Sequence, residues 1–170
     1  HNRCGGAVLD EPYTCAVGEL AKRHGLKLHL DGARIFNAAA SLGVPASRLA
    51  APADSVTFCL SKALCAPVGS VLCGEQRYVG RARRIRKQLG GGMRQAGVLA
   101  AAGIVALETM VDRLPEDHRR ARALAQGLGT IPGILVEDAA PPSNMVYIRL
   151  APDTPLDEAG LQQALASQGI

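Results

Sequence analysis

The sequence predicts an α/β fold followed by a smaller α+β unit, and three observations support this prediction. Residues 26–60 are typical of a strand, a helix and a second strand, and a crossover of this length indicates a parallel, right-handed unit. Beyond residue 130 the order changes to strand, strand and helix. Hydrophobic residues make up 48% of the 170 residues and aromatic ones only 3%, so we expect an aliphatic core. We therefore predict a large domain at residues 1–130 and the beginning of a second domain at 131–170.

The elements of the parallel unit follow one another along the first third of the chain. Asp10 is a suitable N-cap for a helix that ends at Gly25. Residues 26–30 alternate between apolar and polar, as a strand does. The alanine-rich residues 33–42 are expected to form a helix, and a loop leads from it to residues 55–60. Those residues are mostly apolar and β-prone, which predicts a short buried strand.

A strand and three helices are expected next. Residues 71–73 form a short strand, and a basic helix follows at 76–89. Three glycines then interrupt the chain before a long apolar helix at 93–114. Its expected buried residues are Val98, Ala101, Ala102, Val105 and Leu107. A further helix at 116–128 is charged at its start, and His118 in that charged part is expected to be solvated.

The last forty residues change in character. Gly129 and the Pro132-Gly133 pair mark a boundary. Residues 134–137 and 145–150 are typical of strands and are expected to be antiparallel neighbours. Thr154 and Pro155 then open a final helix. This order of elements is the reason for placing a second domain here.

The formal net charge is +4, and much of the excess lies in one short run. This run contains Arg81, Arg83, Arg84, Arg86 and Lys87. A basic run can indicate binding to nucleic acid. No aromatic residues are interleaved with this one, so we expect an exposed or interface helix face and no nucleic-acid partner.

The cysteines and the hydropathy bear on the compartment. Five cysteines are present, an odd number, and no pair has CxxC spacing. Reduced thiols in a cytoplasmic protein fit this better than a disulfide framework. No apolar run reaches the length of a membrane span, so no membrane association is expected. The sequence begins at His1 without Met, so an organellar targeting segment ahead of it stays open.

Two side chains that could take part in a reaction follow the two predicted parallel strands. Lys62 comes just after residues 55–60, and Asp31 comes at the end of residues 26–30. The carboxyl ends of parallel strands are where α/β folds bind ligands, so both would open toward one crevice. Lys62 is then either a nucleophile toward a carbonyl or an ordinary surface lysine.

An arginine three residues past the aspartate completes a set that suits pyridoxal phosphate. The lysine would form a Schiff base, Asp31 would keep the pyridine nitrogen protonated, and Arg34 would hold a substrate carboxylate. An ion pair from Asp31 to Lys62 or to Arg34, with no ligand, explains the spacing equally well. His29 and Asp31 share a strand face, but no third ligand is evident, so no metal site is predicted.

Three segments carry a resemblance to a known family. Residues 29–38 (HLDGARIFNA) resemble the HxDGARxxNA segment of the threonine aldolases of the low-specificity L-threonine and L-allo-threonine type. Residues 60–70 (LSKALCAPVGS) resemble their LSKGLGAPVGS lysine loop, and residues 90–95 match their GGGMRQ segment. His1 and Asn2 are similar to the end of their ENTHN motif. The resemblance runs in order with matching gaps from His1 to about Leu150.

The resemblance implies a three-layer fragment of the large domain of a fold-type-I pyridoxal phosphate enzyme, with the start of a small α+β domain. Lys62 would bind the cofactor as a Schiff base, Asp31 would pair with the ring nitrogen, and Ser61 would touch the phosphate. Arg34 and His1 would contact the substrate. Family members are homo-oligomers, dimers or tetramers, and two further basic residues would lie near a neighbouring subunit's site. These are Lys87 and Arg94.

Some parts of the family pattern are altered or absent. Ala63 and Cys65 stand where the family commonly has glycine, and a side chain at φ > 0 costs roughly 1 kcal/mol or more. Cys65 is otherwise expected to be a small packed side chain. The family's phosphate-binding glycine turn, its ring-stacking histidine and its second substrate arginine are not found in residues 1–170.

The resemblance implies cleavage of L-threonine or L-allo-threonine to glycine and acetaldehyde through the Lys62 Schiff base. Which of the two substrates is preferred is not determined by this segment. One alternative is another fold-type-I lyase of the β-eliminating or hydroxymethyltransferase type. A second alternative is a truncated, inactive chain.

Overall fold

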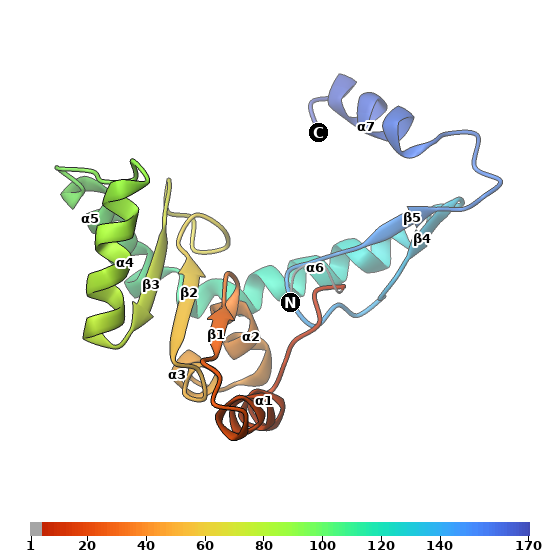
Figure 1. The fold of residues 1–170 in the computed structure, drawn as a ribbon. Helices are drawn as coiled ribbons and strands as arrows, with labels where there is room; N and C mark the ends of the chain where they lie inside the picture. Colours follow the sequence, from red (N-terminus) through yellow and green to blue (C-terminus); the bar gives the residue numbers. More distant parts are fainter. Residues whose placement is uncertain (1–4) are drawn as a thin grey trace.

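The computed structural model describes residues 5–170 and contains a three-stranded sheet in the order β1-β2-β3 (Figure 1). Strand β1 (His29–Asp31) pairs parallel with β2 (Ser55–Cys59). Strand β3 (Ser70–Gly74) pairs antiparallel with β2. The predicted α/β class and the parallel β1–β2 unit are confirmed. Strand β1 starts three residues later than predicted, because the Leu28 N–H bonds the Asp54 carboxylate, 2.9 Å away.

Three helices surround the first two strands. Helix α1 (Glu11–Arg23) begins after Asp10 as predicted, since the Asp10 carboxylate accepts the Tyr13 N–H at 2.9 Å. Helix α2 (Ile35–Leu42) follows β1. Helix α3 (Ala46–Ala50) lies in the stretch expected to be a loop. The loop was predicted because Pro45 and Pro52 flank this stretch. A proline is, however, well suited to the start of a helix, as Pro45 is here.

Apolar side chains on one face of the sheet form the first core. Five buried residues make up this cluster, namely Ile35, Ala38, Ala39, Leu49 and Val56. Phe36 of α2 and Phe58 of β2 extend it with an edge-to-face ring contact, centroids 5.2 Å apart. The core is aliphatic and alanine-rich, as the composition predicted.

The helix predicted at residues 93–114 is wrong in its bounds and in its buried face. After α4 (Gln76–Gln88), residues 90–96 are irregular, and α5 spans only Gly97–Thr109. Val98 and Val105 are 71% and 57% exposed. The face that packs carries small residues, because a Cβ at position 103 would lie only 2.9 Å from a methyl group of the neighbouring lysine-bearing loop.

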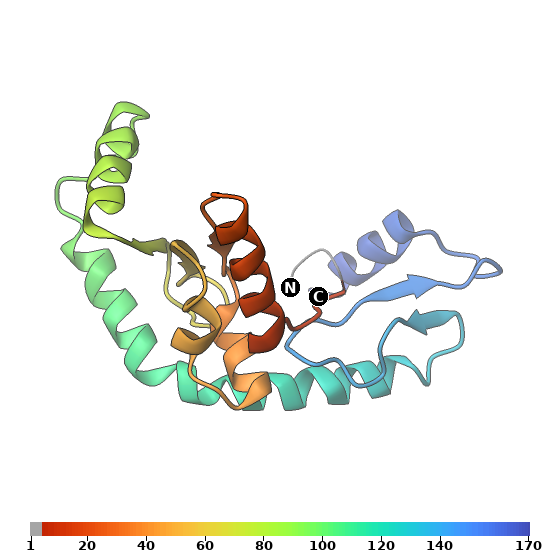
Figure 2. The same cartoon turned by 60° about the horizontal axis from the view of Figure 1, so that its bottom comes forward.

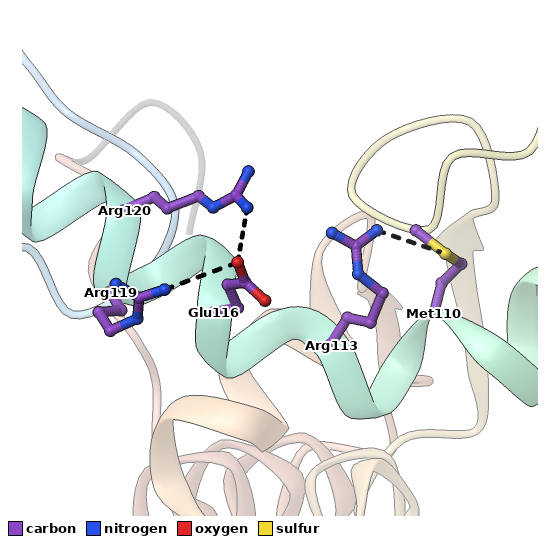
Figure 3. Close-up of polar contacts among 5 residues, drawn as sticks. All are labelled: Met110, Arg113, Glu116, Arg119 and Arg120. Atoms are coloured by element: carbon purple, nitrogen blue, oxygen red, sulfur yellow. Dashed lines mark hydrogen bonds and ion pairs between the residues drawn. The ribbon is translucent and has the colours of Figure 1, made fainter.

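The chain continues through η1 (Val111–Arg113) into α6 (Leu114–Leu128), and polar contacts lie on either side of their junction (Figure 3). Arg113 lies 3.7 Å from the Met110 sulfur. Two further contacts join Glu116 to guanidinium groups of the next turn of α6. These belong to Arg120, at 2.5 Å, and Arg119, at 3.6 Å. The hydrogen bond from Arg120 lowers the pKa of Glu116. All three ion-pair partners are largely exposed, so their contribution to stability is small.

His118 is not solvated, contrary to the sequence-based expectation. Its side chain is 2% exposed at the contact between α2 and α6, and its Nε2 lies 3.2 Å from the Asn37 amide nitrogen. An amide NH₂ can only donate, so this Nε2 accepts and the imidazole is neutral. Burial, followed by the nearby charge of Arg122, lowers the pKa of His118. The charged neighbours in sequence lie on the other faces of the helix.

Helix α6 leads to a second, two-stranded sheet (Figures 1 and 2). Strands β4 (Ile134–Val136) and β5 (Ile148–Leu150) are antiparallel, as predicted, and helix α7 (Glu158–Ser167) follows. Helix α7 begins later than expected, where Asp157 caps it by accepting the Gly160 N–H. The domain boundary near residue 130 stays a prediction. No helix in residues 5–170 is long and apolar enough to cross a membrane.

Candidate active site

Asp31 is the last residue of β1, and the turn after it is fastened to β2. The Asp31 carboxylate accepts the Ala33 N–H at 3.1 Å, and the Gly32 N–H donates to the Thr57 carbonyl at 2.8 Å. A Cβ at Gly32 would lie 2.9 Å from that carbonyl oxygen, so this close approach requires glycine. The exposed carboxylate is therefore held at the carboxyl end of the strand by short local contacts.

The loop between β2 and β3 carries Ser61 and Lys62 on its exposed side. Three of its apolar residues are buried and anchor it to α5 and α6, and they are Leu60, Leu64 and Ala66. Backbone hydrogen bonds close it further, from Leu60 N–H to the Gly69 carbonyl and from Ala66 N–H to the Leu60 carbonyl. Lys62 thus lies on a loop that is held in place by apolar packing and by backbone hydrogen bonds.

The two family glycine positions in this loop differ in backbone conformation. Cys65 has φ +58°, the one non-glycine residue with positive φ in residues 5–170, whereas Ala63 is not in that region. The expectation that Cys65 packs as a small buried side chain is wrong, because its thiol is exposed. The loop therefore keeps the left-handed turn that glycine favours, at a cost in strain.

The parallel pairing brings Asp31 and Lys62 to one edge of the sheet. Asp31 stands opposite Thr57, and Lys62 follows the end of β2 by three residues. Figure 1 shows the ends of the two strands side by side. Arg34, half-buried, is the N-cap residue of α2 and reaches the same edge through the turn after β1. Five hollows on residues 5–170 are lined by other side chains and not by these three.

The other predicted site residues are not brought to this edge in the described chain. Lys87 lies in the last turn of α4, where its side chain covers Gly92, and Arg94 is exposed in the segment before α5. Both belong to the region beyond β3. His1 lies outside the described residues.

The donor set at the sheet edge fits pyridoxal phosphate. An exposed primary amine can react with the aldehyde, a carboxylate can pair with the pyridine nitrogen, and an arginine can bind a carboxylate. These groups are Lys62, Asp31 and Arg34, on two adjacent parallel strands and their turns. No group of three or more potential metal-ligating side chains occurs in residues 5–170.

One polar feature of the same sheet face was missed from the sequence. His29 Nδ1 lies 2.8 Å from the buried Ser55 hydroxyl, two register positions before Asp31 and Thr57. A signal was present, because Ser55, Thr57 and Cys59 alternate with apolar residues along a strand that was interpreted as wholly buried. Such alternation indicates one polar face.

Comparison with protein families gives a match to the beta-eliminating lyase model over residues 1–151. The chain is 49% identical over 170 residues to low-specificity L-threonine aldolase 1 of Arabidopsis thaliana. It is 44% identical over 149 residues to the low specificity L-threonine aldolase of Escherichia coli K12. These alignments cover 100% and 88% of this chain but 48% and 44% of the relatives, so the chain spans about half of their length.

Solved structures show the same fold. A Listeria monocytogenes protein described as a candidate L-allo-threonine aldolase superposes with a TM-score of 0.80 at 23% identity, over 88% of this chain and 42% of that one. The Leishmania major threonine aldolase superposes with a TM-score of 0.66 at 19% identity, over 92% and 44%. The predicted fold, a partial fold-type-I large domain with the start of a further unit, is confirmed.

Proposed function

The chain belongs to the beta-eliminating lyase family, and from this premise we propose that it is part of a pyridoxal-phosphate-dependent aldehyde lyase. The proposed reaction is the cleavage of L-threonine or L-allo-threonine to glycine and acetaldehyde. Relatives of 44–49% identity described as threonine aldolases support this substrate class. Because the chain spans about half of their length, the activity is proposed for the full-length protein.

The observation that carries the proposal is the placement of a carboxylate and an amine at one sheet edge. Asp31 ends β1, and Lys62 follows the end of β2, which is parallel to β1 and pairs with it directly. The turn after Asp31 and the loop around Lys62 are each closed by backbone hydrogen bonds. A carboxylate and an amine at one sheet edge are what a cofactor held at both its aldehyde and its ring nitrogen needs.

Each residue of the set has a proposed role. Lys62 would hold the cofactor covalently through its aldehyde, Asp31 would keep the ring nitrogen protonated, and Ser61 would contact the phosphate. Arg34 would bind the substrate carboxylate, and His1 would approach the substrate hydroxyl. Pyridoxal phosphate, when bound, supplies an electron sink for the electrons of the broken Cα–Cβ bond.

The assembly and the compartment are proposals as well. We place Lys87 and Arg94 beside the site of a neighbouring subunit in a homo-oligomer. The exposed apolar surface of α5 supports an interface in this region. Four free cysteines in the described residues support a reducing compartment such as the cytoplasm.

The experiment is to incubate the full-length protein with pyridoxal phosphate and to record its visible absorbance. We expect a band from the covalent adduct, and its reduction with borohydride followed by peptide mass analysis should locate the cofactor on Lys62. Release of acetaldehyde and glycine from L-threonine is measured in parallel. If Lys62→Ala keeps both the band and the cleavage, the assignment of this lysine is wrong.

A second candidate is β-elimination, which the name of the matching family favours. Product analysis separates the two reactions, because an aldolase yields an aldehyde and glycine, whereas an eliminating lyase yields pyruvate and ammonia. The expectation that residues 1–170 alone are inactive stays a prediction, tested by adding cofactor to this segment.

A further inference from the structure

We propose that His29 is a positioning residue, which holds β1 in the register that presents Asp31 at the sheet edge. The inference rests on the proposed function, because Asp31 is the carboxylate assigned to the cofactor ring. It concerns a pair of side chains, His29 and Ser55, to which that function gives no role.

The strand register places His29 and Asp31 on the same face. His29 pairs with Ser55, and Asp31 pairs with Thr57, two residues further along both strands. Side chains two residues apart in a strand share a face, so these four lie together on one face. Val56, between Ser55 and Thr57, is buried on the opposite face in the apolar core. The sheet is therefore polar on the Asp31 face and apolar on the other.

One hydrogen bond between side chains joins β1 to β2 in the described residues. His29 Nδ1 lies 2.8 Å from Ser55 Oγ. Ser55 is 6% exposed, so without the imidazole its hydroxyl would be buried with no partner, and such a group is costly. The pair is specific, since an apolar side chain at position 29 leaves the Ser55 hydroxyl unsatisfied.

The register of β1 needs such a device because the strand is short. It has three residues, and the backbone hydrogen bonds that extend its pairing lie outside it, at Leu28 on one side and at Gly32 on the other. A slip of one residue would turn Asp31 toward the apolar face and Leu30 toward the polar one. The hydrogen bond at His29 opposes this slip, and it lies two register positions before the carboxylate that must face the cofactor.

A second contact near the same end of the strands provides a matched control. Lys27 and Asp54 form an ion pair of 2.6 Å, and both side chains are largely exposed. Both residues lie just before the strands, so this pair is not part of the His29–Ser55 contact between β1 and β2. Removing it tests whether any weakening at this end of the sheet disturbs the cofactor.

The test uses the full-length protein and compares His29→Phe, Ser55→Ala and His29→Asn. The readouts are the dissociation constant of pyridoxal phosphate, the pH at which its bound absorbance changes, and the melting temperature without cofactor. We expect His29→Phe and Ser55→Ala each to weaken cofactor binding by about 3- to 10-fold and to shift that pH, as the loss of one neutral hydrogen bond implies. The double variant should be no worse than the more affected single variant.

His29→Asn should restore wild-type behaviour, because its amide can donate to the Ser55 hydroxyl. Lys27→Ala should leave the affinity and the pH unchanged. If His29→Phe does not fold, Ser55→Ala, which removes one oxygen, carries the test. The proposal is overturned if Ser55→Ala matches Lys27→Ala, or if His29→Asn fails to restore binding. Absence of a Lys62 adduct in the unaltered protein would instead overturn the function, and this inference with it.

Discussion

The loop that carries Lys62 and helix α5 are both rich in apolar residues, yet the described chain buries the leucines of the loop and leaves most large apolar side chains of α5 exposed. In the loop, Leu60 and Leu64 are 8% and 3% exposed and are packed against α5 and α6. In α5, Ile104 and Val105 are 56% and 57% exposed. Apolar content alone therefore does not locate the core. A segment is buried where it closes on itself and on its neighbours, and the outer face of α5 finds no such neighbours in residues 5–170.

The largest expected effect concerns the amine that the buried loop presents. Lys62→Ala in the full-length protein should lower threonine cleavage by about a thousandfold or more, because the covalent attachment point of the cofactor is lost. Val98→Ala on α5 should leave the rate near that of the unaltered protein. Acetaldehyde release under saturating substrate measures both. Similar rates for the two variants would show that Lys62 is no more important for the reaction than an exposed residue of α5.

The next effect addresses packing directly. Leu64→Ala should lower the free energy of unfolding by about 2–5 kcal/mol, because it leaves a cavity beneath the loop. Val105→Ala should change it by less than about 0.5 kcal/mol, as exposed substitutions do. Urea unfolding of both variants measures the difference. A large loss for Val105→Ala would show that another part of the protein or a second subunit covers α5.

The buried contact between His118 of α6 and Asn37 of α2 extends the comparison of buried and exposed side chains to a polar pair. Burial keeps the pKa of His118 below its ordinary value, so the unfolded state takes up a proton more readily than the folded state. The contribution of His118 to the free energy of unfolding is fully present above about pH 6.5, its pKa in the unfolded chain. This contribution should be lost as the pH drops through the lower pKa of the folded state. Protonation would also set two donors against each other, at Asn37 and at the imidazole. His118→Gln should flatten this part of the stability profile, measured by urea unfolding at several pH values. An unchanged profile would contradict the assignment.

The smallest effect lies inside the loop itself. Cys65→Gly should stabilise the protein by about 0.5–1 kcal/mol, because glycine accepts the positive φ without strain. Ala63→Gly, two residues away at an ordinary φ, should lower stability by about 0.5–1 kcal/mol, since it only adds freedom to the unfolded chain. Thermal unfolding distinguishes the opposite signs. A gain for both variants would mean that the loop is limited by something other than the backbone at Cys65.

Local signals predicted the places of Asp31 and Lys62 in the fold better than they predicted burial. Asp31 and Lys62 could be placed at one sheet edge because parallel strands end together, and strand, helix and strand follow one another in the sequence. The buried face of α5 could not be found, because apolar residues surround that helix and no periodicity distinguishes one side. His118 was misjudged for the converse reason, since its charged neighbours hide a contact with a residue 81 positions earlier.

The floor of the lysine loop is assembled from both sides of the η1 interruption. Ala106 comes from α5 and Leu114 from the first residue of α6, and both belong to the cluster that holds Leu60 and Leu64. Figure 2 shows the two helices following one another toward the C-terminal sheet. A tilt of α6 would therefore also move Leu114, and with it the apolar surface on which the loop carrying Lys62 is packed.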